Sequence, residues 1–313
     1  GMIAANSHAQ LNSVTFNSNL ARKRGGGMLI ENSAPELTNV TFYNNVSNDT
    51  APGSEGGGGI MNVTSSPILK NVTFSGNDSY VVGGDAIRNT VNSAPQISNS
   101  ILWDINDEVI SDGTSTTTIL DSVVKGGFSG TNIITVNPNL GALAYNGGFT
   151  QTMSLDLGSS AFDKGGVNSS CATTDQRGIS RPQGAACDIG AYELIPPLPT
   201  HTVIFNANGG TGSMSNQTNN VATALTLNAF TRTGYTFTGW NTAANGSGTA
   251  YANGATYPFT ADATLYAQWS INSYTVTFNA NGGTGSMSNQ TQNYNVATAL
   301  TLNAFTRTGY TFT

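Results

Sequence analysis

The chain has 313 residues, of which 9% are charged, and its formal net charge is -6. This balance argues against nucleic-acid partners, which need clustered Lys and Arg. A chain of this length holds two or three domains of ordinary size, and its many Gly, Asn, Ser and Thr residues favour β structure with turns over helices. No apolar run approaches the roughly 20 residues of a membrane span, so we expect no membrane insertion within this sequence.

Three similar segments recur in the first hundred residues: "LNSVTFNSN" from Leu11, "LTNVTFYNN" from Leu37 and "LKNVTFSGN" from Leu69. In each, Val and Phe are two residues apart, which places both on one face of a strand. Strands stacked in parallel about 4.8 Å apart would bury Val on Val and Phe on Phe. The pattern predicts a parallel β-solenoid.

Asparagines recur at two equivalent positions of these segments. Stacking would align them into ladders, in which each side-chain amide bonds to the neighbours above and below. The expected ladders are Asn39, Asn71 and Asn99, and Asn19, Asn45 and Asn77.

The tetrapeptides "FNSN", "FYNN" and "FSGN" alternate with "GGGM", "GGGI" and "GGDAI". They resemble the Phe-x-x-Asn and Gly-Gly-Ala-Ile motifs of polymorphic outer-membrane-protein repeats. The resemblance implies a right-handed parallel β-helix of the kind found in bacterial surface adhesins. We expect such repeats over residues 1–139.

The repeat pattern ends near Leu140, and the sequence that follows contains "CATTDQRGISRPQGAACDIGAYE". The Asp-Gln-Arg-Gly, Arg-Pro and Cys-Asp-Ile-Gly-Ala elements resemble the terminal segment of bacterial surface proteins described as choice-of-anchor Q. This resemblance implies the last coils and the cap of the β-helix, over residues 140–194. The following "IPPLPT", residues 195–200, predicts an extended linker, because its prolines favour the polyproline II conformation.

Two cysteines, Cys171 and Cys187, lie close together without a histidine nearby. A disulfide would close a loop of about 15 residues, worth on the order of 3 kcal/mol, and would imply an oxidising compartment. Two buried free thiols are the alternative.

Charges of both signs surround the cysteines, and ion pairs that fix a cap explain them more simply than an active centre does. The residues are Asp175, Arg177, Arg181, Asp188 and Glu193.

The stretch "FNANGGTGSMSNQT" occurs at residues 205–218 and again at 278–291. The "YTVTFNANGG" opening, the "GYTFTGWNTAANGSGTAY" centre and the "TLYAQW" close resemble the Listeria-Bacteroides repeat, also called the internalin B repeat. The resemblance implies small β-grasp-like domains that occur in tandem on secreted and wall-attached bacterial proteins. We assign the copies to residues 201–269 and 274–313. The second copy stops at the counterpart of Thr238, so we expect a truncated, poorly packed domain.

No Gly-x-Ser-x-Gly or His-Glu-x-x-His motif is present, and we predict no catalytic residue, cofactor site or metal site. The strongest enzymatic candidate is the acidic cluster Asp104, Asp107 and Glu108, because β-helices host polysaccharide lyases and hydrolases that need paired carboxylates or calcium-binding Asp. No Lys or Arg lies nearby in sequence, and we interpret the cluster as a solvated corner.

Aromatic residues of the first repeat could stack on sugar rings, chiefly Trp240, Tyr251 and Trp269. A domain of this size needs most of its aromatics for its core, which is the interpretation we prefer.

The sequence thus predicts an all-β, extracellular protein of the bacterial cell surface or a secreted one. A right-handed parallel β-helix stalk would precede small β-grasp-like repeats. Its expected role is structural and adhesive, toward an unidentified surface ligand such as a glycan or a host or cell-wall protein. The alternative is a carbohydrate-active β-helix, either a lyase or hydrolase or a glycan-binding protein.

Overall fold

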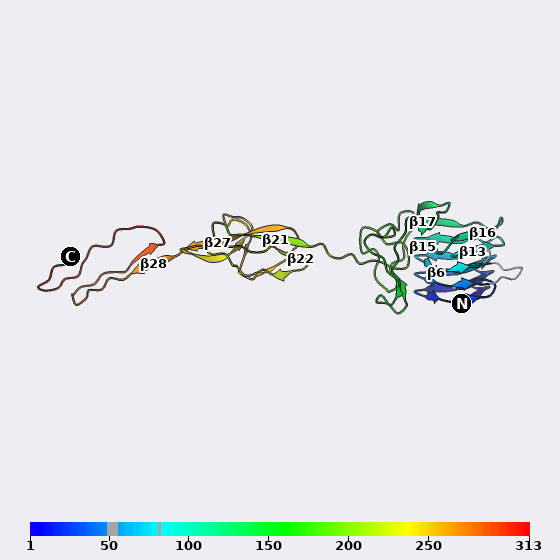
Figure 1. Cartoon of the computed structure of the whole chain (residues 1–313), viewed down its shortest axis with the longest axis horizontal. Helices are drawn as coiled ribbons and strands as arrows, with labels where there is room; N and C mark the ends of the chain where they lie inside the picture. The colour runs from blue at the N-terminus through cyan, green and yellow to red at the C-terminus, as the bar shows by residue number, and fades with distance from the viewer. Residues whose placement is uncertain (49–55, 81–82) are drawn as a thin grey trace. The chain divides into compact units, whose positions relative to one another are not determined.

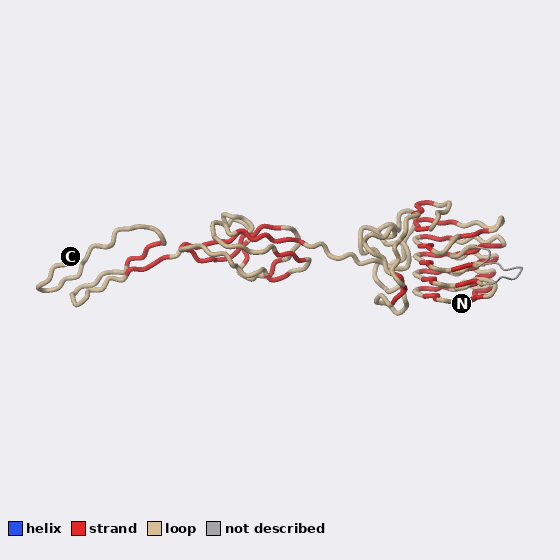
Figure 2. The backbone as a smooth tube through the Cα atoms, viewed as in Figure 1, coloured by secondary structure: helices blue, strands red, loops and turns tan. Residues whose placement is uncertain are grey.

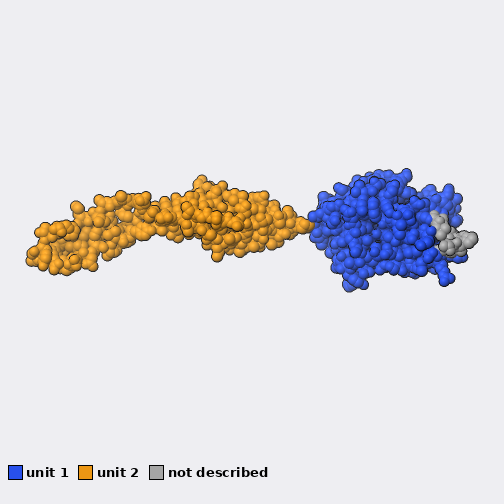
Figure 3. Space-filling model, viewed as in Figure 1, with its two compact units in different colours: residues 1–196 blue, residues 197–313 orange. Residues whose placement is uncertain are grey.

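The structure is a computed structural model that describes residues 1–48, 56–80 and 83–313 (Figures 1 and 2). Strands, turns and loops make up these residues, with no helix among them, so the all-β prediction is confirmed. The chain divides into two compact units, residues 1–196 and 197–313 (Figure 3).

Short parallel strands stacked coil on coil build most of the first unit, as Figure 1 shows. One sheet consists of β1 (Met2–Ala5), β5 (Met28–Glu31), β9 (Ile60–Val63), β13 (Ile87–Thr90) and β16 (Val109–Ser111). A second sheet has two rows that meet on β17 (Thr118–Val124). The rows are β2 (Gln10–Asn12), β6 (Glu36–Thr38), β10 (Ile68–Lys70) and β14 (Gln96–Ser98), and β3 (Thr15–Asn17), β7 (Thr41–Tyr43), β11 (Thr73–Ser75) and β15 (Ile101–Trp103).

A third, narrow sheet and one further strand complete the coils. The narrow sheet consists of β4 (Leu20–Ala21), β8 (Val46–Ser47) and β12 (Asp78–Ser79). Strand β18 (Thr131–Ile134) pairs in parallel with β17. Because the pairing from coil to coil is parallel throughout the described residues, the predicted parallel β-helix is confirmed.

Like side chains stack inside the solenoid. The rings of Phe16, Phe42 and Phe74 lie 4.7 and 4.8 Å apart, with 6° between their planes, which matches the separation of neighbouring strands. Gly27 and Gly59 leave room for this stack, because a Cβ on either would come within 2.8 Å of a phenyl ring.

The fourth coil varies this arrangement, and the variation explains why its repeat lacks the phenylalanine. Ala86 aligns with Gly59, and Leu102 aligns with Phe74. Both Ala86 and Leu102 are fully buried. Leu102 is smaller than the phenylalanine of the other coils and therefore leaves room for the methyl group of Ala86, which the glycine of the preceding coil lacks.

One asparagine ladder forms as predicted. Asn19 donates its side-chain amide to Oδ1 of Asn45, and Asn45 donates to Oδ1 of Asn77, each over 2.8 Å. The same oxygens accept the backbone N–H of the preceding asparagine. The amides of Asn45 and Asn77 also donate to the carbonyls of Phe16 and Phe42, so the ladder ties side chains and backbone of successive coils together.

The second expected ladder, Asn39–Asn71–Asn99, is wrong. These asparagines have φ values of 55°, 52° and 49°, a left-handed conformation that asparagine tolerates better than most residues. Their side chains bond to residues 163–194 instead. Asn39 donates to the carbonyl of Thr174, and Asn71 accepts the N–H of Ala172. Asn99 accepts the N–H of Gly166 and donates to Ser169.

Residues 140–194 therefore line the side of the solenoid, a difference from the coils and cap that we expected there. Gln176 bonds the hydroxyls of Thr15 and Thr41 in the first and second coils. Farther along the stack, the N–H of Ala191 donates to the hydroxyl of Thr73 in the third coil. This segment holds one short antiparallel pair, β19 (Leu143–Ala144) and β20 (Thr152–Met153). We call residues 140–194 the flanking segment.

The first repeat copy is a small mixed β domain in the second unit. Its main sheet runs in the order β22 (Gln217–Asn219), β21 (His201–Asn206), β27 (Ala263–Ile271), β24 (Tyr235–Asn241) and β25 (Ala250–Tyr251). A second pair joins β23 (Thr223–Ala224) to β26 (Thr256–Tyr257). The core gathers around Trp240, Phe205 and Leu265.

The second copy contains one hairpin, β28 (Ser273–Val276) with β29 (Gln290–Asn293). Leu225 of the first copy is 3% exposed, whereas its counterpart Leu300 is 62% exposed. Similarly, Phe205 is buried and its counterpart Phe278 is only half-buried. The second copy is thus less well packed, as expected.

We predict that Asn77→Ala strongly destabilises the first unit, because it removes the acceptor for two N–H groups of Asn45 and the donor to Phe42 and Asp104. Each buried polar group left without a partner costs about 1–3 kcal/mol. Urea unfolding of the full chain measures the loss. The matched control is Asn12→Ala, at an exposed position, which should change stability by less than about 0.5 kcal/mol. Equal losses in the two variants would contradict the ladder's role.

Candidate functional site

The asparagine ladder ends on two carboxyl groups, Asp104 and Glu108. Oδ1 of Asp104 accepts the backbone and side-chain N–H groups of Asn77 over 2.7 and 2.9 Å. Oε1 of Glu108 accepts the backbone N–H of Asp104 over 2.8 Å and so takes the next place in the series. A carboxyl group suits this end, because the last member has to accept hydrogen bonds and a further amide would need its own acceptors.

Both carboxyl groups hold protons more tightly than usual. Burial, followed by repulsion from Asp104, raises the pKa of Glu108 to about 9. Burial also raises the pKa of Asp104 to about 7, against the hydrogen bonds from Asn77 that lower it. The second oxygen of each carboxyl group, Oδ2 of Asp104 and Oε2 of Glu108, is buried without a hydrogen-bond partner. Burial therefore favours the neutral form of both groups.

The predicted acidic cluster does not assemble as a unit. Asp104 and Glu108 are each 4% exposed, whereas Asp107 is exposed. The solvated-corner interpretation was therefore wrong for the first two residues. A buried pair offers no surface to a polysaccharide. The residues that the structure describes contain no group of three or more His, Cys, Asp or Glu placed to hold a metal ion.

Two charged residues beside the pair were missed by the sequence analysis. Asp85 is fully buried, and its carboxylate accepts the N–H groups of Ser79 and Asn106; burial raises its pKa. The sequence does contain a sign that Asp85 is special, because Asp85 occupies the position that Gly58 has in the preceding coil. Lys125 donates to the carbonyls of Asp104 and Ile105 over 2.6 Å. No local sequence pattern marks Lys125, because it lies one coil away.

A buried network of opposite charges organises the flanking segment. Arg181 forms an ion pair with Glu193 over 2.7 Å, and both side chains are 1% exposed. Its guanidinium also donates to the carbonyls of Asp188 and Gly190. Arg177 pairs with Asp175 over 2.8 Å. The network thus fixes turns of the segment against one another.

The remaining member, Asp188, is held chiefly by the backbone. Its carboxylate accepts the N–H groups of Asp163 and Leu194, and burial raises its pKa to about 6. Nearby, a disulfide joins Cys171 to Cys187. The disulfide and the two ion pairs lie within one stretch of about 25 residues. Together they stabilise a segment that has little regular secondary structure.

The aromatic residues of the first repeat pack against one another. Trp240 is 1% exposed and contacts Phe205 and Phe237, with ring centroids 4.9 and 5.0 Å apart. Trp269 is half-buried, and its indole N–H donates to the carbonyl of Ala207. Tyr251 is also half-buried, 5.1 Å from the buried Tyr257. Stacking of a glycan on Trp240 is therefore excluded while the domain is folded.

Comparison with known protein families identifies the repeats of the second unit. Residues 201–268 and 274–313 match the Listeria-Bacteroides repeat domain. The resemblance noted in the sequence is thereby confirmed for these two segments. No solved structure matches the chain.

Two curated proteins are similar to parts of the chain. A putative Gly-rich membrane protein of Evansella cellulosilytica is 59% identical over 51 residues, which are 16% of this chain and 6% of that protein. Internalin H of Listeria monocytogenes is 36% identical over 118 residues, which are 38% of this chain and 20% of that protein. The chain thus spans a fifth or less of the length of these relatives. Within the part that the structure describes, we find no helix of the length and apolarity that a membrane crossing requires.

We predict that the stability of the first unit falls as the pH rises from about 4 to about 9. The folded chain keeps protons on Asp104 and Glu108 that the unfolded chain releases near pH 4. The stabilisation from these protons is fully present below about pH 4, and it is lost once the pH exceeds the pKa values of the folded chain. Asp104→Asn should flatten the decline, because its amide oxygen still accepts from Asn77 and the amide has no carboxyl proton to release. Thermal unfolding from pH 5 to pH 9 tests this, and an equally steep decline in the variant would contradict it.

We also predict that Arg181→Ala costs about 3–5 kcal/mol in the flanking segment, since it leaves the carboxylate of Glu193 buried without its cation. Hydrogen exchange should show faster opening of residues 161–194. The double variant Arg181→Met with Glu193→Leu should recover much of the loss, because it removes both charges. Arg22→Ala, at an exposed site, is the control. Unchanged protection in Arg181→Ala would show that the ion pair contributes little.

Proposed function

We propose that the chain belongs to a bacterial cell-surface or secreted protein and acts there as a non-catalytic, adhesive stalk. It would present repeat modules for attachment to a surface, a glycan, or a host or cell-wall protein. The tandem match to the Listeria-Bacteroides repeat domain carries this proposal. The name internalin H and the word membrane in the name of the other relative agree with a surface location.

The chemistry of the first unit supports a structural role. Its buried ionisable side chains include Asp104, Glu108, Arg181 and Glu193, which form hydrogen bonds and an ion pair within the ladder and the turns. A disulfide persists in an oxidising environment such as the cell exterior. A solenoid contributes length additively, coil by coil. These properties suit a protein that holds modules away from an anchoring point.

Surface display tests the proposal. We expect a non-adherent bacterium that displays the full chain to attach to host cells, cell-wall fragments or immobilised glycans more strongly than the same host displaying an unrelated β domain. The double variant Asp104→Asn with Glu108→Gln keeps ladder-type hydrogen bonding and should attach equally well. Attachment no better than that of the unrelated domain would refute adhesion. Release of reducing ends from a polysaccharide, abolished in the double variant, would instead establish an enzyme.

A further inference from the structure

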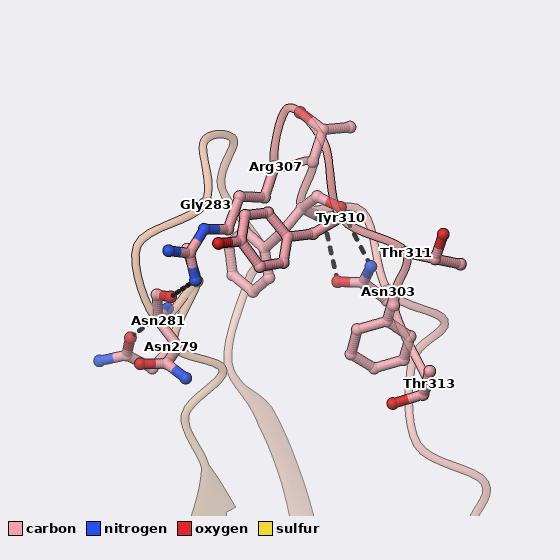
Figure 4. A pocket seen from close by; sticks show the side chains of 12 residues that line it. Asn279, Asn281, Gly283, Asn303, Arg307, Tyr310, Thr311 and Thr313 are labelled. Carbon is pink, nitrogen blue, oxygen red and sulfur yellow. Dashed lines mark hydrogen bonds between the residues drawn. The ribbon is translucent and has the colours of Figure 1, made fainter.

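A groove of about 620 Å³ lies in the second repeat copy (Figure 4). Arg307 stacks on the ring of Tyr310 there and donates to the carbonyl of Asn281. Phe305 of its lining is the counterpart of Phe230, which is buried in the core of the first copy. The lining of this groove therefore belongs to the packing of the repeat fold, and we assign it no ligand.

A smaller groove, of about 220 Å³, lies on the outer face of the solenoid. Its floor spans β10, β14 and β17, which pair in parallel in that order. Alternate residues of a strand point to opposite faces. Because Leu69, Ile97 and Ile119 are buried in the core, the residues on either side of each point outward. The outward residues form two rows, one with Ile68, Gln96 and Thr118 and the other with Lys70, Ser98 and Leu120.

One side of the groove is a stretch of the flanking segment that buried groups hold in place. Ser169 and Ser170 line this side. Asn99 donates to the hydroxyl of Ser169 over 3.0 Å and to the carbonyl of Ser170 over 3.3 Å. The hydroxyl of Ser169 in turn donates to Oδ2 of Asp121 over 2.7 Å. Because Asn99 and Asp121 are both fully buried, this side of the groove is fixed before any ligand binds.

The groove carries positive charge in a chain that has an excess of acidic residues. Lys70 lines it and no aspartate or glutamate does, whereas the chain as a whole has a net charge of -6. Among the residues that the structure describes, Lys70 forms no ion pair, and its ammonium donates to the hydroxyl of Ser170 over 3.3 Å. The carboxylate of Asp121, behind Ser169, accepts hydrogen bonds from three neighbouring side chains. Lys70 is therefore able to pair with an anionic ligand.

The remaining lining combines hydrogen-bonding groups with apolar ones. The hydroxyls of Ser98 and Thr118 and the amide of Gln96 can each donate and accept. Ile68, which is 40% exposed, and Leu120 add an apolar surface. A sugar residue has hydroxyl groups at its edge and C–H groups on its faces, so this lining matches both. The volume is below the roughly 300–1,000 Å³ of pockets that enclose a drug-sized ligand, which leaves room for one sugar residue.

A carboxylate suits the charge of this groove better than a phosphate does. One ammonium balances one negative charge, and a hydrogen bond between an ammonium and a carboxylate is about twice as strong as one between neutral groups. Phosphate sites instead gather arginine side chains or several backbone N–H groups. No arginine lines this groove.

We propose that this groove binds one carboxylated sugar residue of an acidic polysaccharide. The carboxylate pairs with the ammonium of Lys70, and the C–H face of the sugar ring packs on Ile68 and Leu120. The site is separate from the repeat modules, to which the proposed function assigns attachment, so either proposal can fail alone.

Equilibrium binding of labelled oligosaccharides to the full chain tests this site. The probes are oligomers of polygalacturonate, alginate and hyaluronan, each also prepared as its neutral methyl ester. We expect saturable binding of at least one acidic oligomer and at least tenfold weaker binding of its ester. Lys70→Ala should weaken binding about tenfold, the loss of one charge-assisted hydrogen bond, and Lys70→Arg should retain it. Ser98→Phe, which fills the groove and leaves its charge unchanged, should also weaken binding at least tenfold.

Lys23→Ala is the matched control, since Lys23 is an exposed lysine outside the groove. This variant should bind like the wild-type chain. The proposal would be overturned by no saturable binding of any acidic probe, by equal binding of an acidic oligomer and its ester, or by wild-type binding in Lys70→Ala or Ser98→Phe. It would also be overturned by a loss in Lys23→Ala as large as that in Lys70→Ala, or by equally tight binding of poly-glutamate, because the chain would then respond to charge alone.

Discussion

Hydrogen bonding from coil to coil, at the separation of neighbouring parallel strands, is the constraint on which the first unit depends. It requires each coil to place the same kind of side chain at the same position. Phe16, Phe42 and Phe74 meet this requirement in the core. Serines meet it at a turn, where the N–H of Ser33 donates to the hydroxyl of Ser65, and that of Ser65 to the hydroxyl of Ser93.

A ladder of amides has a direction, and its direction explains where carboxyl groups stand. Each asparagine donates toward the next coil, so the series needs a member that only accepts. Asp104 is that member for the buried ladder. Asp121 aligns with Asn99 in the other row and accepts hydrogen bonds from Asn168, Ser169 and Asn132. In a chain with few charges, these carboxyl groups therefore complete hydrogen-bonding patterns where the repeat comes to an end.

The sequence predicted the features that repeat from coil to coil. It did not predict the side-chain interactions that occur in one coil only. Val–Phe alternation was enough for the solenoid, and the Asn45–Asn77 ladder followed from equal spacing. Asn39 and Asn71 have the same spacing, but a left-handed backbone directs them to a segment 135 and 101 residues farther along the chain. Periodicity carries no information about such a segment. The burial of Asp104 was missed for the same reason, since Asn77, which bonds its carboxyl group, lies in the preceding coil.

The duplicated stretch shows how far identical residues can differ in packing. Residues 205–218 and 278–291 have the same sequence, yet Phe205 is 6% exposed and Phe278 is half-buried. Local contacts survive in both copies, since each keeps its Arg–Tyr stack and its asparagine turn. What differs is the presence of β24 and β27, which supply Trp240 and Trp269. In the first copy, these two strands therefore supply much of the apolar surface of the core.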